Sequence, residues 1–176
     1  MRWRPDRNIV LTGFMAVGKS AVGKRLAEKL NRPFVDLDLA IERREQMTVQ
    51  EIFATKGEPH FRKLEKELLR EALAEHGRVV ATGGGAVADE ENLLLIKRDS
   101  LLVCLTAAPE TILARAEAEG NKRPLLAGTD KLQAIRTMLS AREAAYRQAD
   151  LTVDSDRRSV DEVVEEIVRR IEKIAS

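Results

Sequence analysis

The sequence has one cysteine, almost no net charge and no long hydrophobic run. It carries 30 Lys and Arg residues against 29 Asp and Glu residues, a formal charge of +1. A chain so evenly charged is not expected to bind nucleic acid through bulk electrostatics. Cys104 has no cysteine partner and lies in the apolar run LLVCL, which indicates a buried thiol. No stretch approaches the roughly 20 apolar residues of a membrane span.

The chain also lacks internal repeats and any Pro-rich or Gly/Ser-rich linker. Its 176 residues, 44% of them hydrophobic, therefore predict one globular domain over 1–176. The first residues, MRWRPDRNIVLTG, do not contain the apolar core of a signal peptide. We expect a protein of the reducing cytoplasm.

Short apolar runs alternate with amphipathic patterns along the chain. The runs predict buried strands at 9–11, 34–35, 79–81, 101–105 and 151–153. Continuous apolarity is typical of parallel strands that are covered on both faces. Helical spacing is present at about 19–30 and 61–76, after Asp130 and after Ser159. The sequence therefore predicts an α/β fold, a five-stranded parallel sheet with helices on both faces.

Two segments interrupt this alternation. Residues 38–58 read as one or two short helices, and 119–130 (EGNKRPLLAGTD) is a polar stretch with two glycines and a proline. We predict a substrate-binding insertion at about 36–62 and a lid at about 119–129, because loops at such places often carry function.

Residues 13–20, GFMAVGKS, fit the pattern G-x-x-x-x-G-K-[ST] and stand between a predicted strand and a predicted helix. In this phosphate loop the backbone N–H groups and the helix N-terminus face phosphate oxygens. Lys19 is expected to reach the β- and γ-phosphates, and the Ser20 hydroxyl to ligate Mg²⁺. The alternative, a chance glycine-rich turn, is disfavoured by the flanking strand and helix. The loop predicts binding of a nucleoside triphosphate.

Two classes of nucleotide-binding protein do not fit. A guanine-specific switch needs an Asn-Lys-x-Asp box, and the nearest string, 121–124, has proline at the last position. A motor ATPase needs a longer chain and an apolar strand ending in Asp or Asp-Glu, whereas the third strand here ends in 82–85, TGGG. A small-molecule kinase is favoured.

Two carboxylates and three glycines follow predicted strands, where open α/β sheets bind ligands. Asp36 is suited to hold Mg²⁺ through a water, and Asp38 to take the proton of an acceptor hydroxyl. The alternative for this pair is a helix N-cap with a first-turn charge. Gly83, Gly84 and Gly85 allow the backbone to touch a ligand directly, although a plain strand-to-helix turn is also possible.

Three arginines suggest an anionic acceptor. Arg142 lies on the apolar stripe of its helix, which implies a carboxylate partner from the protein or from a ligand. Arg62 has Glu65 three residues on, either to orient it or as a surface ion pair. Arg123 lies in the predicted lid, where it can act as an arginine finger. Together they favour a small hydroxylated carboxylic acid.

These residues match a known pattern. GKS, FVDLDLAIE, GEPHFRKLEKE, GGGAV, KRPLL and the 142–146 segment, in this order, resemble the shikimate kinase family over about 8–158. The resemblance implies a P-loop fold like that of nucleoside-monophosphate kinases. It also implies ATP-dependent, Mg²⁺-dependent phosphorylation of the shikimate 3-hydroxyl in aromatic amino acid biosynthesis. The expected partners are ATP and shikimate, with no nucleic acid and no membrane, and the chain is expected to be a monomer.

The resemblance also assigns roles to residues. The catalytic residues are expected to be Lys19, Asp38 and Arg123. The expected ATP-binding residues are Gly13, Ala16, Val17, Gly18, Lys19, Ser20, Ala21, Arg123 and Arg158, with Arg115 as a further candidate beside the adenine. Shikimate is expected to contact Asp38, Arg62, Gly83, Gly84, Gly85 and Arg142, and the metal to be held by Ser20 and by Asp36 through water.

The chain departs from the family at two positions of the loop region. Ala16 replaces a usual glycine, and Ala21 replaces a usual Ser or Thr. Alanine at 16 predicts an ordinary right-handed or extended backbone there. The missing hydroxyl at 21 removes a possible contact to the α-phosphate. We expect weaker nucleotide binding at most, and no loss of activity.

Three other functions remain open. A gluconate-type kinase shares the phosphate loop but gives no reason for the GGG and FRxxE combination. A nucleoside-monophosphate kinase has a phosphate acceptor, which the carboxylates of Asp36 and Asp38 would repel. A non-catalytic nucleotide-binding or scaffold protein would be expected to lack Lys19, Asp38 or Arg123, and all three are present.

Overall fold

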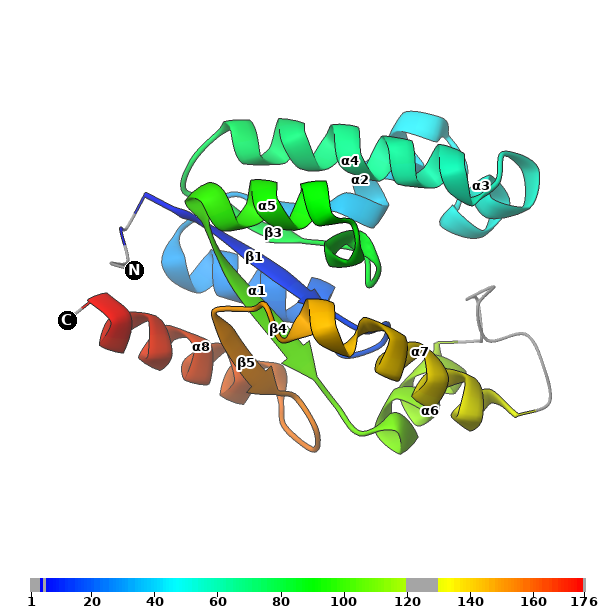
Figure 1. Ribbon diagram of the computed structural model, residues 1–176. Coiled ribbons are helices and arrows are strands. Elements are labelled where there is room, and N and C mark those ends of the chain that lie inside the picture. The colour runs from blue at the N-terminus through cyan, green and yellow to red at the C-terminus, as the bar shows by residue number, and fades with distance from the viewer. Residues whose placement is uncertain (1–3, 5, 120–129, 176) are drawn as a thin grey trace.

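A five-stranded, all-parallel sheet forms the centre of the protein in a computed structural model that describes residues 4, 6–119 and 130–175 (Figure 1). Its strand order is β2-β3-β1-β4-β5. The strands are β1 (Asn8–Gly13), β2 (Phe34–Asp36), β3 (Val79–Ala81), β4 (Ser100–Thr106) and β5 (Leu151–Asp154). The predicted strands and their parallel arrangement are confirmed. All six residues of β1 are buried, as expected for a central strand covered on both faces.

Helices cover both faces of this sheet. Helices α1 and α8 pack against each other on one face, and α4 and α5 pack together on the other (Figure 1). The helices are α1 (Lys19–Leu30), α2 (Leu37–Glu45), α3 (Val49–Thr55), α4 (Glu58–Ala74), α5 (Glu90–Asp99), α6 (Pro109–Ala118), α7 (Lys131–Tyr146) and α8 (Val160–Ala175), with a short 3₁₀ turn η1 (Ala86–Ala88). Helix α4 begins three residues before the predicted start. Pro59 fits its first turn, because N–H groups there have no partner within the helix.

The segment after β2 consists of two short helices, as predicted. Asp36 caps α2, and a capping box of Thr48 and Glu51 begins α3. Most of the predicted lid, including Arg123, lies at 120–129, outside the described residues. Over the residues that the structure describes, no helix is long and apolar enough to cross a membrane.

Cys104 lies in the middle of the core on β4, with 1% of its surface exposed. Burial raises the pKa of its thiol to about 11, because the thiolate would lose its hydration there. The prediction of a buried thiol is confirmed.

Candidate active site

The phosphate loop joins β1 to α1. Gly13 has a φ of +137°, and a Cβ built on it would stand 2.3 Å from the Leu105 carbonyl oxygen, so only glycine fits there. Gly18, with a φ of +96°, is the N-cap of α1 and gives its first N–H groups no side-chain acceptor. Those N–H groups are therefore suited to bind phosphate. The Lys19 ammonium lies across the loop and donates to the carbonyls of Gly13 and Phe14, at 2.9 and 2.7 Å.

Ala16 has a φ of +57°, in the left-handed region. The prediction of a right-handed or extended backbone at this position is wrong. The path of the loop requires a left-handed residue there, and an L side chain in that region costs roughly 1–2 kcal/mol. A glycine at this position would carry almost no such cost. The loop of this chain therefore contains a strained residue that its surroundings must hold in place.

Ser20 and Asp36 meet beside the loop. The Ser20 hydroxyl donates to Asp36 Oδ2 at 2.5 Å, while Asp36 Oδ1 accepts from the Leu39 N–H at 3.2 Å. Asp36 is thus the N-cap of α2, which was the alternative to a magnesium-associated role. The cap uses only one of its oxygens, and the other contacts Ser20. A hydroxyl and a carboxylate oxygen are hard ligands of the kind that Mg²⁺ takes, together with waters and substrate phosphates. These two residues therefore fit a magnesium site at this position.

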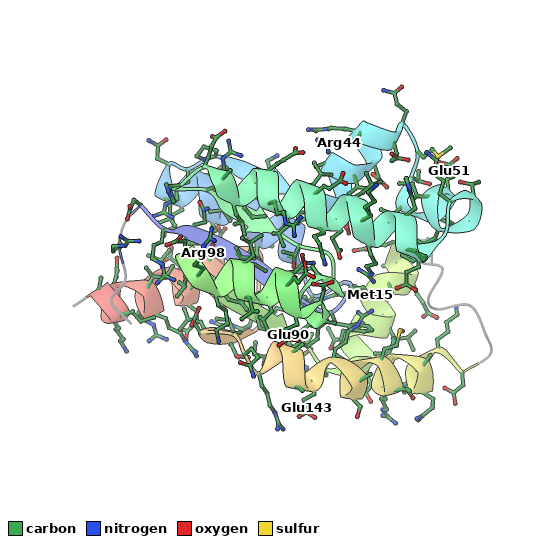
Figure 2. All side chains as sticks on the ribbon, turned by 45° about the horizontal axis from the view of Figure 1, so that its top comes forward. Met15, Arg44, Glu51, Glu90, Arg98 and Glu143 are labelled. Atoms are coloured by element: carbon green, nitrogen blue, oxygen red, sulfur yellow. The ribbon has the colours of Figure 1, made fainter. Side chains whose placement is uncertain are left out.

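A cleft of about 560 Å³ lies next to the phosphate loop. Met15, labelled in Figure 2, contributes to its wall. The polar and glycine part of the lining consists of Asp38, Arg62, Glu65, Gly83, Gly84, Gly85 and Arg142. All of the residues predicted to contact the acceptor are therefore brought together, from α2, α4, α7 and the turn after β3.

The glycines at 83–85 allow the charged side chains to approach the backbone. A Cβ on the first glycine would stand 2.8 Å from Glu65 Oε2 and 3.1 Å from Asp38 Oδ1. One on the second would stand 3.1 Å from Arg142 Nη1, and one on the third 2.6 Å from Arg62 Nη2. The distances of 2.6 and 2.8 Å are shorter than real Cβ contacts, and 3.1 Å is tighter than most of them. Each glycine thus makes room for a charged group, which a plain turn would not require.

Arg62 forms one buried and one exposed ion pair. Its Nη1 donates to Glu65 Oε1 at 2.9 Å, and its Nη2 lies 3.3 Å from Glu58 Oε1. The Glu65 side chain is only 1% exposed, whereas that of Glu58 is 58% exposed. Burial raises the pKa of the Glu65 carboxyl, and the charge of Arg62 opposes that shift. The expected orienting contact is present, so the ion pair is more than a surface one.

Arg142 points inward from α7, as its place on the apolar stripe predicted. Its guanidinium lies 5.3 Å from the centre of the Phe14 ring, within the range of a cation–π contact. One turn further on, the Tyr146 hydroxyl donates to the Gly84 carbonyl at 2.7 Å, which fixes α7 against the glycine turn. Within the described part of the chain no carboxylate forms an ion pair with Arg142. Its charge therefore faces the cleft and is available to an anion.

A second pocket, of about 760 Å³, lies on the other side of the loop. Its wall includes Ala16, Val17 and Gly18 of the loop together with Arg115 and Arg158. Both arginines that the resemblance placed near the adenine therefore face one cavity. Ala21 lies outside its wall, on the exposed side of α1.

One residue in this pocket has no signal in the sequence. Ser155, just after β5, is only 3% exposed. Its hydroxyl lies 2.9 Å from the Val17 carbonyl and 3.0 Å from that of Thr106, and it accepts from Arg115 Nη1 at 3.2 Å. A lone serine in a loop matches no motif, and its partners are distant in sequence.

Known proteins match this chain in sequence along nearly its whole length. The model of the shikimate kinase family matches residues 15–172. A shikimate kinase of Symbiobacterium thermophilum is 45% identical over 168 residues, which cover 94% of this chain and 97% of the relative. The chain belongs to the shikimate kinase family.

Solved structures agree with this family. The shikimate kinase from Acinetobacter baumannii, solved in complex with shikimate, superposes with a TM-score of 0.90 at 34% identity, covering 95% of this chain and 93% of the other. A gluconokinase from Sinorhizobium meliloti reaches a TM-score of 0.59 at 18% identity, covering 98% and 95% of the two chains. That second likeness shows a shared fold alone.

Proposed function

We propose that the chain transfers the γ-phosphoryl group of ATP to the 3-hydroxyl of shikimate, giving shikimate 3-phosphate and ADP. Membership of the shikimate kinase family supports the reaction. The observation that carries it is the meeting of Asp38, Arg62 and Arg142 in one cleft beside the phosphate loop. These side chains come from three helices far apart in the sequence, and together they suit a hydroxylated carboxylate.

The phosphate loop and the second pocket are suited to ATP. N–H groups at the start of α1 and the Lys19 ammonium would surround the β- and γ-phosphates. The adenosine would occupy the pocket beside Arg115 and Arg158. Arg123, outside the described residues, remains the expected arginine finger.

The cleft is suited to hold shikimate in one orientation. Arg62 and Arg142 would bind its carboxylate, because guanidinium groups pair strongly with carboxylates. The glycine turn at 83–85 would offer its backbone to the ring, since the turn itself carries no side chains. Asp38 would then accept a hydrogen bond from the 3-hydroxyl and take its proton as the new P–O bond forms. Positioning and charge neutralisation account for most catalysis in phosphoryl transfer.

Ser20 and Asp36 would hold Mg²⁺, directly and through water respectively. Their side chains share a hydrogen bond of 2.5 Å, and both offer hard oxygen atoms of the kind that Mg²⁺ takes. When bound, Mg²⁺ supplies neutralisation of the negative charge on the phosphates. Dependence on this metal, the monomeric state and the cytoplasmic location remain predictions.

An acceptor panel tests the proposed function. ADP release is measured with ATP and Mg²⁺ in the presence of shikimate, gluconate, a nucleoside monophosphate or no acceptor. Of these reactions, we expect only the one with shikimate to release ADP rapidly. Release with gluconate or a nucleoside monophosphate, with shikimate inert, would overturn the proposed acceptor. ADP release at the same rate with and without each acceptor would indicate an ATPase.

A further inference from the structure

Two carbonyl groups of the phosphate loop are held by residues from distant parts of the chain. The Ala16 carbonyl accepts from Arg115 Nη1 on α6, at 3.4 Å. The Val17 carbonyl accepts from the Ser155 hydroxyl after β5, at 2.9 Å. Both carbonyls belong to the turn in which Ala16 adopts its left-handed backbone.

Ser155 and Arg115 form one hydrogen-bonded unit. Arg115 Nη2 donates to the Ser155 carbonyl at 2.9 Å, and its Nη1 donates to the Ser155 hydroxyl at 3.2 Å. The Ser155 N–H donates to the Thr106 carbonyl at 2.8 Å, so the serine is fixed to the end of β4. The bonds to Arg115 and Thr106 therefore fix the position of the serine independently of its contact with the phosphate loop. Its hydroxyl has one proton, which it gives to Val17 or to Thr106.

We propose that Ser155 is a positioning residue for ATP binding, which holds the strained turn at Ala16 and Val17 so that the loop N–H groups point at the phosphates. The left-handed alanine disfavours this turn by roughly 1–2 kcal/mol, an amount comparable to the worth of one or two hydrogen bonds. A chain with glycine at 16 would keep the turn without help. The Ser155 contact is thus most needed in this chain.

The proposal rests on the proposed ATP site and adds a residue to it. Ser155 lines the nucleoside pocket, so a direct contact with the nucleotide is the main alternative explanation for any effect on binding. The two explanations differ in their dependence on residue 16. A direct contact is independent of the residue at 16, whereas a contact that offsets strain loses its importance when the strain is removed.

The test is a double-mutant cycle between positions 16 and 155, with Mg²⁺–ADP binding measured by titration calorimetry. We expect Ser155→Ala to weaken ADP binding about tenfold, within the loss typical for a buried hydrogen bond. Shikimate affinity should change less than about twofold, and Ser155→Thr, which keeps the hydroxyl, should restore ADP binding. In the Ala16→Gly background, Ser155→Ala should cost about threefold or less.

Ser159→Ala is the matched control. Ser159 lies in the same loop, but its hydroxyl accepts from the Glu162 N–H at 3.2 Å as the cap of α8, whereas the Ser155 hydroxyl contacts the Val17 carbonyl of the phosphate loop. We expect this variant to lose stability and to keep its ADP affinity. Thermal unfolding of every variant shows whether it is folded at the temperature of the titration.

Several results would overturn the proposal. A Ser155→Ala variant with unchanged ADP affinity, an equal loss for ADP and shikimate, or the same loss in the Ala16→Gly background would each do so. An equal loss of ADP affinity in Ser159→Ala would assign the effect to the loop as a whole. Failure of the wild-type chain to bind ADP would instead contradict the proposed function.

Discussion

The strain at Ala16 can be measured by removing it. Ala16→Gly should relieve roughly 1–2 kcal/mol, the cost of a left-handed L residue. The same change removes a methyl group that is 8% exposed and makes the unfolded chain more flexible. Each of those two effects lowers the free energy of unfolding by about 1 kcal/mol or less. The free energy of unfolding should therefore remain within about 0.5 kcal/mol of the wild-type value.

Ala27→Gly is the matched comparison. Ala27 is 2% exposed in α1, so glycine there loses a similar methyl group and the helix propensity of alanine, with no strain to relieve. We expect it to destabilise the protein by roughly 1–2 kcal/mol. The difference between the two variants measures the strain, and it should appear as roughly 3–6 °C in Tm for a chain of this size.

Urea denaturation followed by circular dichroism provides the free energies, provided that the m-values of the variants agree. An equal destabilisation of Ala16→Gly and Ala27→Gly would refute the reasoning. The backbone at 16 would then not be left-handed in solution, and the contact with Ser155 would have no strain to offset.

Three further predictions concern the cleft and the core. Arg142→Ala should raise KM for shikimate roughly 10- to 100-fold and leave KM for ATP nearly unchanged, because a charge-assisted hydrogen bond is lost. Arg147→Ala is the control: Arg147 is exposed at the C-terminal cap of α7 and paired with Glu143, so its loss should change neither KM. Equal losses for both substrates in Arg142→Ala would contradict the carboxylate assignment. Asp38→Asn should lower kcat about 10²-fold or more with little change in KM for ATP, as expected for a lost base, and a kcat near the wild-type value would exclude that role. Cys104 should resist alkylation at pH 8, because burial raises its pKa to about 11 and few thiolates form. The free energy of unfolding should also fall as the pH rises from about 9 towards 11, because the thiol ionises in the unfolded chain before it does in the folded one. Cys104→Ala should weaken that pH dependence.

The phosphate loop was predictable because its signal is local. Eight consecutive residues contain the whole motif, and the structure places it at the junction of β1 and α1 as expected, with only the backbone at Ala16 different. The orientation of Arg142 was predictable for a similar reason. Helical periodicity alone assigns a residue to the buried or the exposed side of its helix.

The two features that the sequence did not show depend on contacts over long distances. Ala16 was expected to have an ordinary backbone because alanine alone prefers one. The loop overrides that preference, since its path is determined by the glycines around it and by bonds from other elements. Ser155 is 138 positions from Val17, its hydrogen-bond partner in the loop. The pairing of β4 with both β1 and β5 brings them together.

The most direct test of the account is the identity of the product. The chain is incubated with ATP, Mg²⁺ and shikimate, and the product is examined by ³¹P and ¹H NMR. We expect one monophosphate ester whose phosphorus couples to the proton on carbon 3. A phosphate on another hydroxyl would contradict the orientation set by Asp38, Arg62 and Arg142. Inorganic phosphate as the sole product would contradict the proposed transfer itself.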